Sequence, residues 1–144
     1  VQQGAGDPVG IGAVSPGPRR RLQRMTEPGD LIAGQALVEL HQRIGSAHLH
    51  LGEHEEARAA FQTALSLFEE RLRLGADDPY TRFYVAGIHA LRGEPEQALS
   101  SLGRAVRMRR RFNAARARIE PEFAGVRDDP RFERLLVAER QSTL

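Results

Sequence analysis

The sequence predicts an all-α protein made of antiparallel helix hairpins that stack on one another. Apolar residues recur every three or four positions in successive stretches, which is the spacing of one face of an α-helix. Glycine and proline, which end helices, separate these stretches. Residues 44–65 also match residues 85–106 when the two are superposed at an offset of 41. The helices therefore form a unit that occurs twice.

The first two helices are separated by Gly52. Asp30 is a good N-cap, so we expect the first helix to begin there. Its apolar residues are Leu31, Leu37, Leu40, Ile44, Ala47 and Leu51. The second helix ends at Gly75, and its apolar residues are Ala57, Ala60, Phe61, Ala64, Leu65, Phe68 and Leu72.

Three further helix starts follow. The run Asp77-Asp78-Pro79 combines an acidic cap with proline in the first turn and predicts a third helix to about Leu91. Gly93-Glu94-Pro95 makes the next turn, and a fourth helix holds Ala98, Leu99, Leu102, Ala105 and Val106. Asp128-Asp129-Pro130 starts a last helix through Phe132, Leu135 and Leu136.

Three regions are predicted along the chain. Residues 1–29 are rich in Gly and Pro and show no periodicity, so we expect a flexible tail. Residues 30–118 form two hairpins, and residues 119–144 cover their end. The first Met is residue 25, so Val1 reflects an unusual start codon, a fragment, or a true start at Met25.

Composition narrows the class of protein. The chain has no cysteine, which excludes disulfides and zinc-thiolate sites. No apolar run approaches the roughly 20 residues of a membrane span, so we expect a cytoplasmic protein with no membrane partner. All 21 basic residues are Arg, which with the abundant Ala and Gly suggests a bacterial source.

The repeated unit resembles the tetratricopeptide repeat. In the first copy the matching residues are His41, Ile44, Gly45, His48, Ala57 and Phe61, and in the second they are Arg82, Val85, Ala86, His89, Ala98 and Leu102. Small residues sit where paired helices cross closely, and bulky ones fill the space between hairpins. The resemblance implies a short right-handed solenoid that binds proteins. The offset of 41 exceeds the usual ~34 because the helix ending in FEERLRLGADDP is longer.

The last part of the chain resembles the terminal segment of such arrays in bacterial serine/threonine kinases and transcriptional regulators. The matching residues are Pro121, Phe123, Asp128, Asp129, Pro130, Arg131, Phe132, Leu135 and Leu136. Repeat arrays need a cap because the last hairpin would otherwise expose its apolar face. The resemblance implies a C-terminal capping helix and a place in a larger kinase or regulator.

The resemblance also implies a concave groove lined by the first helix of each hairpin. In the first hairpin its positions are Glu39, Gln42, Arg43, Ser46, Leu49 and His50, and in the second they are Tyr80, Phe83, Tyr84, Gly87, Ala90 and Leu91. The aromatic cluster at positions 80, 83 and 84 is our first choice for contact with a peptide or partner helix. The alternative is that these aromatics pack against the first hairpin.

An arginine-rich segment, residues 104–118, forms a basic patch. Its main members are Arg104, Arg107, Arg109, Arg110 and Arg111, and residues 98–118 contain no acid. Such charge suits nucleic acid or a phosphorylated, acidic partner. The alternative is a solvated helix face paired with the acids of residues 53–56, 69–70 and the C-terminal segment. Binding of nucleic acid or an acidic partner is therefore the second hypothesis, behind a protein or peptide partner.

The stretch HLHLGEHEE, residues 48–56, is rich in the side chains that bind metals. Residues two apart on a helix point to roughly opposite faces, so His48 and His50 do not converge. We interpret the stretch as a turn around Gly52 followed by acids that begin the next helix. The sequence also contains no phosphate loop or catalytic motif. We expect no metal, cofactor or enzymatic activity.

Overall fold

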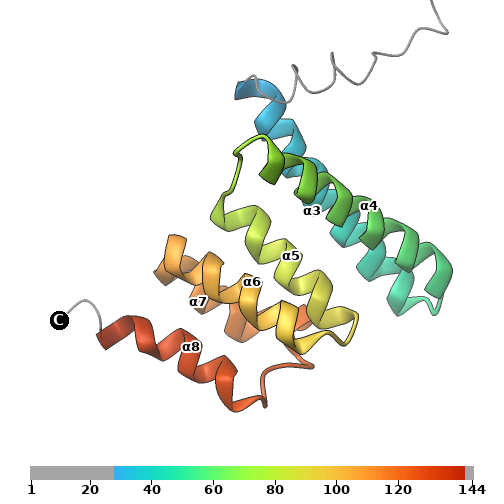
Figure 1. The fold of residues 1–144 in the computed structure, drawn as a ribbon. Coiled ribbons are helices and arrows are strands. Elements are labelled where there is room, and N and C mark those ends of the chain that lie inside the picture. Colours follow the sequence, from blue (N-terminus) through green and yellow to red (C-terminus); the bar gives the residue numbers. More distant parts are fainter. Residues whose placement is uncertain (1–27, 142–144) are drawn as a thin grey trace, which may run out of the picture.

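The computed structural model describes the backbone of residues 28–141 and the side chains of residues 33–137. This part is entirely helical, with six α-helices, one short 3₁₀ helix and no strand (Figure 1). The helices form hairpins that follow one another, with α3 and α4 side by side at one end and α8 at the other. The prediction of an all-α helical repeat is confirmed. Most of the predicted flexible tail lies outside the described residues.

The first hairpin consists of α3 (Pro28–His50) and α4 (His54–Arg73). The first helix therefore begins two residues before Asp30, which was the predicted cap. Between the helices Gly52 has a φ of 77°, and the N–H of Glu53 donates to the carbonyl of His48 at 2.9 Å. This is a Schellman ending, whose left-handed residue favours glycine.

The second hairpin consists of α5 (Pro79–Leu91) and α6 (Pro95–Met108). Its turn copies the first, because Gly93 has a φ of 72° and the N–H of Glu94 donates to the carbonyl of His89 at 2.9 Å. As predicted, Asp78 caps α5 by accepting a hydrogen bond from the N–H of Thr81 at 2.8 Å. The two hairpins thus repeat in backbone detail as well as in sequence.

The end of the chain adds α7 (Arg110–Ile119), the 3₁₀ helix η2 (Pro121–Phe123) and α8 (Pro130–Gln141). The sequence predicted α8 but did not separate α7 from the helix before it. The break lies at Arg109, whose φ and ψ are −149° and 78°. Behind it the buried amide of Asn113 donates to the carbonyl of Ala105 at 2.9 Å, which ties α7 to α6.

Two hydrophobic clusters form the interior. The first joins α3, α4 and α5 and contains Val38, Ala57, Phe61, Ala64, Phe68, Val85 and Ile88. The second joins α5 and α6 to the C-terminal elements, and its larger members include Phe83, Leu102, Val106, Phe123, Phe132 and Leu136. Because α5 contributes to both clusters, it is the helix around which the two halves pack.

Gly45 shows why the repeat needs small residues. A Cβ atom placed there would lie 2.4 Å from the ring of Phe61, so α3 and α4 approach until the ring fills the space of a side chain. The prediction of a close crossing at this position is confirmed. In the second hairpin the equivalent residues are Ala86 and Leu102, both fully buried.

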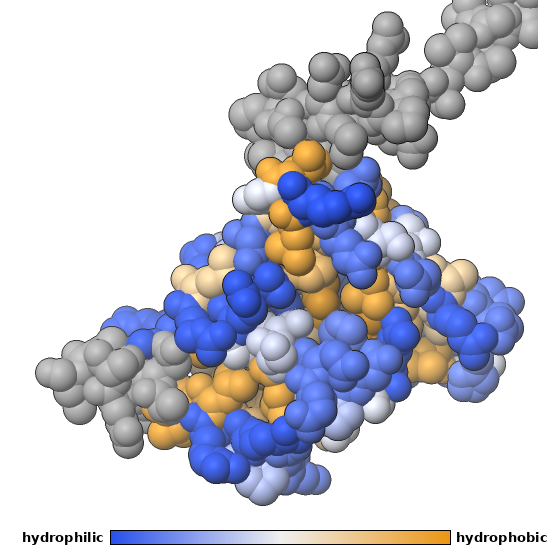
Figure 2. All heavy atoms as spheres, viewed as in Figure 1, coloured by the Kyte–Doolittle hydropathy of each residue, from blue (hydrophilic) through white to orange (hydrophobic). Residues whose placement is uncertain are grey.

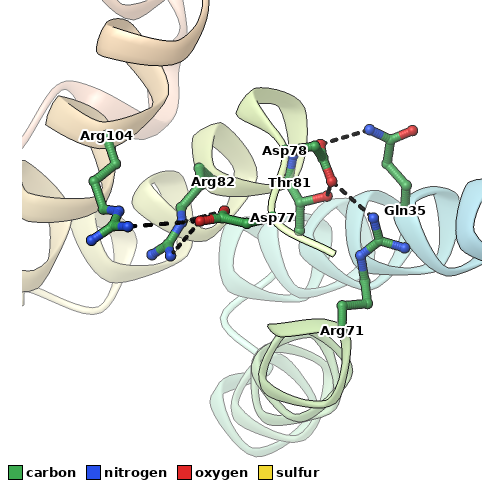
Figure 3. A network of polar contacts seen from close by, with 7 residues as sticks. All are labelled: Gln35, Arg71, Asp77, Asp78, Thr81, Arg82 and Arg104. Carbon is green, nitrogen blue, oxygen red and sulfur yellow. Dashed lines mark hydrogen bonds and ion pairs between the residues drawn. The ribbon is translucent and has the colours of Figure 1, made fainter. Parts of the chain in front are cut away.

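A polar network fixes the link between the hairpins (Figure 3). Asp78 accepts hydrogen bonds from Gln35 of α3 at 2.7 Å and from Arg71 of α4 at 2.8 Å. Asp77 beside it accepts from the guanidinium of Arg82 at 2.8 and 3.0 Å. Asp78 therefore connects both helices of the first hairpin to the first turn of the second.

The face of the molecule in Figure 2 is mostly polar. Hydrophilic residues cover most of the face in Figure 2, and hydrophobic ones gather mainly in a strip at its upper centre and a patch at its lower left. Within residues 28–141, no helix has the length and hydropathy needed to cross a membrane.

Candidate partner-binding groove

The first helices of the two hairpins, α3 and α5, pack together, and their shared surface carries the predicted groove. Near its N-terminal end the surface is open. A hollow of about 220 Å³ is lined there by Gln35, Ala36, Glu39, Tyr80 and Tyr84. Three of the predicted groove residues, Glu39, Tyr80 and Tyr84, thus border space that another molecule can enter.

The C-terminal end of the same surface is closed. Gln42 and Phe83 are only 2% and 3% exposed, and the hollow that they line with Gly87 leaves about 10 Å³, the size of one water molecule. The reason is η2, which packs on α5. Its Phe123 ring lies 5.1 Å from the ring of Phe83. Gln42, Phe83 and Gly87 were predicted to contact a partner, but all three are buried in this structure.

The remaining predicted positions on α3 differ in exposure. Arg43 is exposed and borders the closed hollow. Ser46 and His50 line neither hollow, and the Nδ1 of His50 lies 2.8 Å from the carbonyl of Ser46. They belong to the predicted groove side of α3 but do not line the open hollow.

The sequence analysis did not identify three residues of the groove wall. They are Arg109, Phe112 and Arg116, and all belong to α7 or its cap. The guanidinium of Arg116 lies 4.6 Å from the ring centre of Phe83 and 5.5 Å from that of Tyr84. Arg109 lies 5.1 Å from the ring centre of Tyr80. Phe112 meets Tyr80 edge-on at 6.1 Å. Positions 109, 112 and 116 follow helical spacing, which is the signal that could have identified this face.

The three predicted aromatic residues pack in different places. Phe83 belongs to the second hydrophobic cluster and Tyr84 borders the first, so the alternative of packing against the first hairpin holds for Tyr84. Tyr80 instead lies between Arg109 and the open hollow. Of the three predicted aromatics, Tyr80 and Tyr84 line the open hollow.

Tyr84 also joins two arginines from different helices. The pKa of Arg43 is raised, first by its hydrogen bond with Glu39 and further by one with Tyr84, while burial opposes the shift. Burial would lower the pKa of Arg116, but hydrogen bonds with Tyr84 and Glu120 raise it. The groove wall is therefore a connected polar network in which these cations are already matched by carboxylates.

The basic patch is divided between α6 and the start of α7. Arg104 and Arg107 are exposed on α6, and Arg104 lies 3.8 Å from Asp77. Arg109 caps α7 against Tyr80, while Arg110 and Arg111 begin that helix. Further along, Arg116 pairs with Glu120 and Arg118 with Glu133. The pairs of Arg116 and Arg118 with acids of the C-terminal segment agree with one part of the second interpretation. Glu53 and Glu55 pair instead with His48 and Arg58.

The histidine-rich stretch is a turn, as the sequence indicated. The Nδ1 of His48 lies 3.0 Å from Glu53, and the equivalent His89 lies 2.7 Å from Glu94. These pairs span each hairpin turn from the end of one helix to the start of the next. Among the described residues, no three His, Cys, Asp or Glu side chains gather as a metal site requires.

A family model described as tetratricopeptide repeat matches residues 35–111, which is more than half of the chain. No curated protein and no solved structure matches significantly. The matched residues contain most of α3, all of α4, α5 and α6, and the close crossing at Gly45 described above. The chain therefore belongs to the tetratricopeptide repeat family, whose repeats are protein-interaction modules and generally non-catalytic scaffolds.

Proposed function

We propose that this protein binds a segment of a partner protein in the open part of the groove between α3 and α5. The observation that carries the proposal is the hollow beside Tyr80 and Tyr84, whose rings are half-buried. Tyrosine offers a partner both an apolar face and a hydroxyl at a small cost in conformational entropy. Because η2 closes the other end of the surface, a partner enters from the N-terminal side of the groove.

The side chains around the hollow suggest the chemistry of the bound segment. Gln35 and Glu39 supply polar groups from α3, and the tyrosines supply an apolar floor from α5. Arg43 is balanced by Glu39 at 3.0 Å, so the charges near the hollow are mixed. This favours an extended peptide or helix with one apolar anchor and polar neighbours over a strongly acidic ligand.

The test begins with a peptide selected from a random displayed library on the full chain. Its affinity is then measured by fluorescence anisotropy for the wild type and for Tyr80→Ala and Tyr84→Ala. We expect each variant to bind at least about tenfold more weakly, since buried aromatic anchors are worth about 2 kcal/mol or more. Gln97→Ala, exposed on α6 and outside the lining of the hollow, is the control and should bind normally.

Retained affinity in both tyrosine variants, with circular dichroism unchanged, would move the site elsewhere. The larger hollow between the hairpin turns, lined in part by His54, Arg58 and Arg92, is the place to which it would move. Substitutions there then become the ones that abolish binding. The two hollows lie on different helix faces, so one set of variants distinguishes them.

Salt dependence separates this proposal from nucleic-acid binding. Phosphate contacts make affinity fall steeply with salt, whereas binding to a tyrosine-lined groove of mixed charge should change little. Labelled single- and double-stranded nucleic acids are titrated with the full chain at low and physiological salt. Tight, salt-sensitive binding that is lost on replacing Arg107 and Arg111, both exposed, would instead favour the basic patch.

The resemblance of the last segment supports a further part of the proposal, that this module serves as the C-terminal part of a larger bacterial kinase or regulator in the cytoplasm. Antibodies against the 144-residue chain, which alone has a mass of 16.0 kDa, would test it in fractionated source cells. We expect a band of much greater mass in the cytoplasmic fraction. A single band near 16 kDa would contradict the larger parent.

A further inference from the structure

An exposed apolar stripe runs along the outer side of α3 and is not used by the groove. Its members are Ala33, Leu37, Leu40, Ile44, Ala47 and Leu51, spaced alternately by four and three residues. Leu37, Leu40 and Leu51 are 42%, 49% and 73% exposed. The spacing is that of a two-helix seam, and such a stripe on a monomer indicates a contact surface.

The equivalent face of α5, in the second hairpin, is buried. At the offset of 41, Leu40 corresponds to Thr81, which is 1% exposed in α5. The next two members of the stripe correspond to residues that lie in the hydrophobic cluster between the hairpins, namely Val85 and Ile88. The same helix face is thus buried against a neighbouring hairpin in α5 and left uncovered in α3.

We propose that a second copy of this chain covers the stripe, with the two α3 helices antiparallel about a twofold axis near residue 42. In this register small residues oppose large ones in two kinds of layer, Ala33 with Leu51 and Leu37 with Ala47 of the other copy. Nearest the axis two branched side chains meet, Leu40 with Ile44 of the other copy. A surface whose size pattern complements itself on reversal is what a twofold, isologous interface requires.

The rest of the molecule favours this arrangement over a head-to-tail stack. A stack would need the second hairpin to receive the stripe of the next copy, but Phe123, Phe132 and Leu136 of the C-terminal elements already pack on that hairpin. Arg43 is the one Arg of α3, and it pairs with Glu39 at 3.0 Å on the groove side of the helix. This ion pair therefore lies outside the seam.

The stripe and the groove lie on separate faces of the same helix. At 100° per residue, the stripe is centred roughly 120° from the groove positions 35, 39 and 43. Pairing through the stripe therefore leaves the open hollow accessible on each copy. The proposal does not depend on the groove, and the two can fail independently.

Oligomeric state gives the first test. The full chain is analysed by sedimentation velocity over a concentration series, together with Leu40→Glu and Ile44→Glu. We expect a dimer for the wild type and at least a tenfold weaker dimer for each variant, because a carboxylate would be buried in the seam. Gln62→Glu on exposed α4 is the matched control. A wild type that is monomeric at all concentrations overturns the proposal, and the stripe then serves a different helix.

Cross-linking tests the register, since the chain has no native cysteine. Positions 37 and 47 are about 15 Å apart along one helix. Leu37→Cys mixed with Ala47→Cys should therefore form a disulfide dimer under mild oxidation, while each variant alone should form little. Cross-linking of Leu37→Cys alone to the same extent as the mixture would show parallel helices and overturn the antiparallel arrangement. Gln62→Cys should not cross-link, and circular dichroism confirms that every variant is folded.

Discussion

The carboxylate of Asp78 lies 2.8 Å from the Nη2 of Arg71, and this pair joins the two hairpins. The Arg71 side chain is only 4% exposed, whereas that of Asp78 is 23% exposed. Asp78 also accepts from the hydroxyl of Thr81 at 2.7 Å, so one carboxylate serves as helix cap, ion-pair partner and link. A guanidinium buried to this degree depends on its partner.

Asp78→Ala should be among the most destabilising substitutions on the described surface. It removes a helix cap, worth about 1 kcal/mol, and leaves Arg71 without this carboxylate, which in buried pairs costs about 3 kcal/mol. We expect the free energy of unfolding in urea to fall by about 4 kcal/mol in total. Asp77→Ala is the neighbouring control and should cost about 1 kcal/mol, as for a partly exposed pair. Equal losses in the two variants would contradict the special role of Asp78.

Asp78 should also make stability depend on pH. Burial alone would raise the pKa of this carboxyl, but hydrogen bonds from Thr81, Gln35 and Arg71 bring it below the ordinary value of 3.8. The folded state therefore binds this proton less tightly than the unfolded state, so the carboxylate stabilises the fold at neutral pH. That contribution is lost as the pH falls below about 4.

Urea denaturation of the wild type and of Asp78→Asn between pH 7 and pH 3 measures this effect. The stability difference between the two should be largest at pH 7 and should narrow toward pH 3. A difference that stays constant over this range would show that Asp78 titrates normally.

Gly45→Ala should destabilise the first hairpin through a steric clash. The new methyl group would lie 2.4 Å from a ring atom of Phe61. Overpacking costs about 3 kcal/mol and the better helix propensity of alanine returns about 1 kcal/mol, so we expect a net loss of about 2 kcal/mol. Gly87→Ala is the control, since its methyl group would meet Glu122 at an ordinary 3.4 Å.

The second hairpin suggests a second substitution that should restore stability to Gly45→Ala. There the pair equivalent to Gly45 and Phe61 is Ala86 and Leu102, and both are fully buried. Gly45→Ala combined with Phe61→Leu should therefore be more stable than Gly45→Ala alone, by about 1 kcal/mol. Additive losses in thermal denaturation would mean that the ring of Phe61 is not the source of the clash.

Arg116→Ala should loosen α7 from the groove wall. Its guanidinium lies 4.6 Å from the ring centre of Phe83 and 3.0 Å from Glu120, and the lost cation–π and ionic contacts are together worth about 2 kcal/mol. The near-ultraviolet circular dichroism of the tyrosines should also change, because the chain contains no Trp. Arg111→Ala, exposed on the same helix, should shift stability by less than about 0.5 kcal/mol.

Several features of the fold follow from local rules and could be predicted. Gly52 and Gly93 adopt the left-handed backbone that ends a helix, and Asp78 with Pro79 begins one. The repeat of these signals at one offset predicted two hairpins and the family. Errors occurred where local signals were weak. Asp30 seemed a cap on sequence grounds, but α3 begins at Pro28, and the break at Arg109 carries neither glycine nor proline.

The candidate site was only partly predictable, for a physical reason. Repeat position indicates which residues of α3 and α5 face the groove, and Tyr80 and Tyr84 were found in this way. It does not show that η2 packs over Gly87 and buries Phe83, because this contact joins residues about 40 positions apart. The covering of Tyr80 by Arg109 likewise depends on the turn of the chain before α7.

The amino-acid sequence by itself determined the helices, their turns and their pairing into hairpins, since these depend on side-chain periodicity and on the backbone preferences of Gly, Pro and Asp. Only the tertiary structure decided which faces stay exposed. Leu40 and Thr81 occupy equivalent positions, yet one is 49% exposed and the other 1%, because a neighbouring hairpin packs on α5 and none of the described elements packs on that face of α3. Exposure depends on the neighbours of a helix, and these neighbours come from distant parts of the chain.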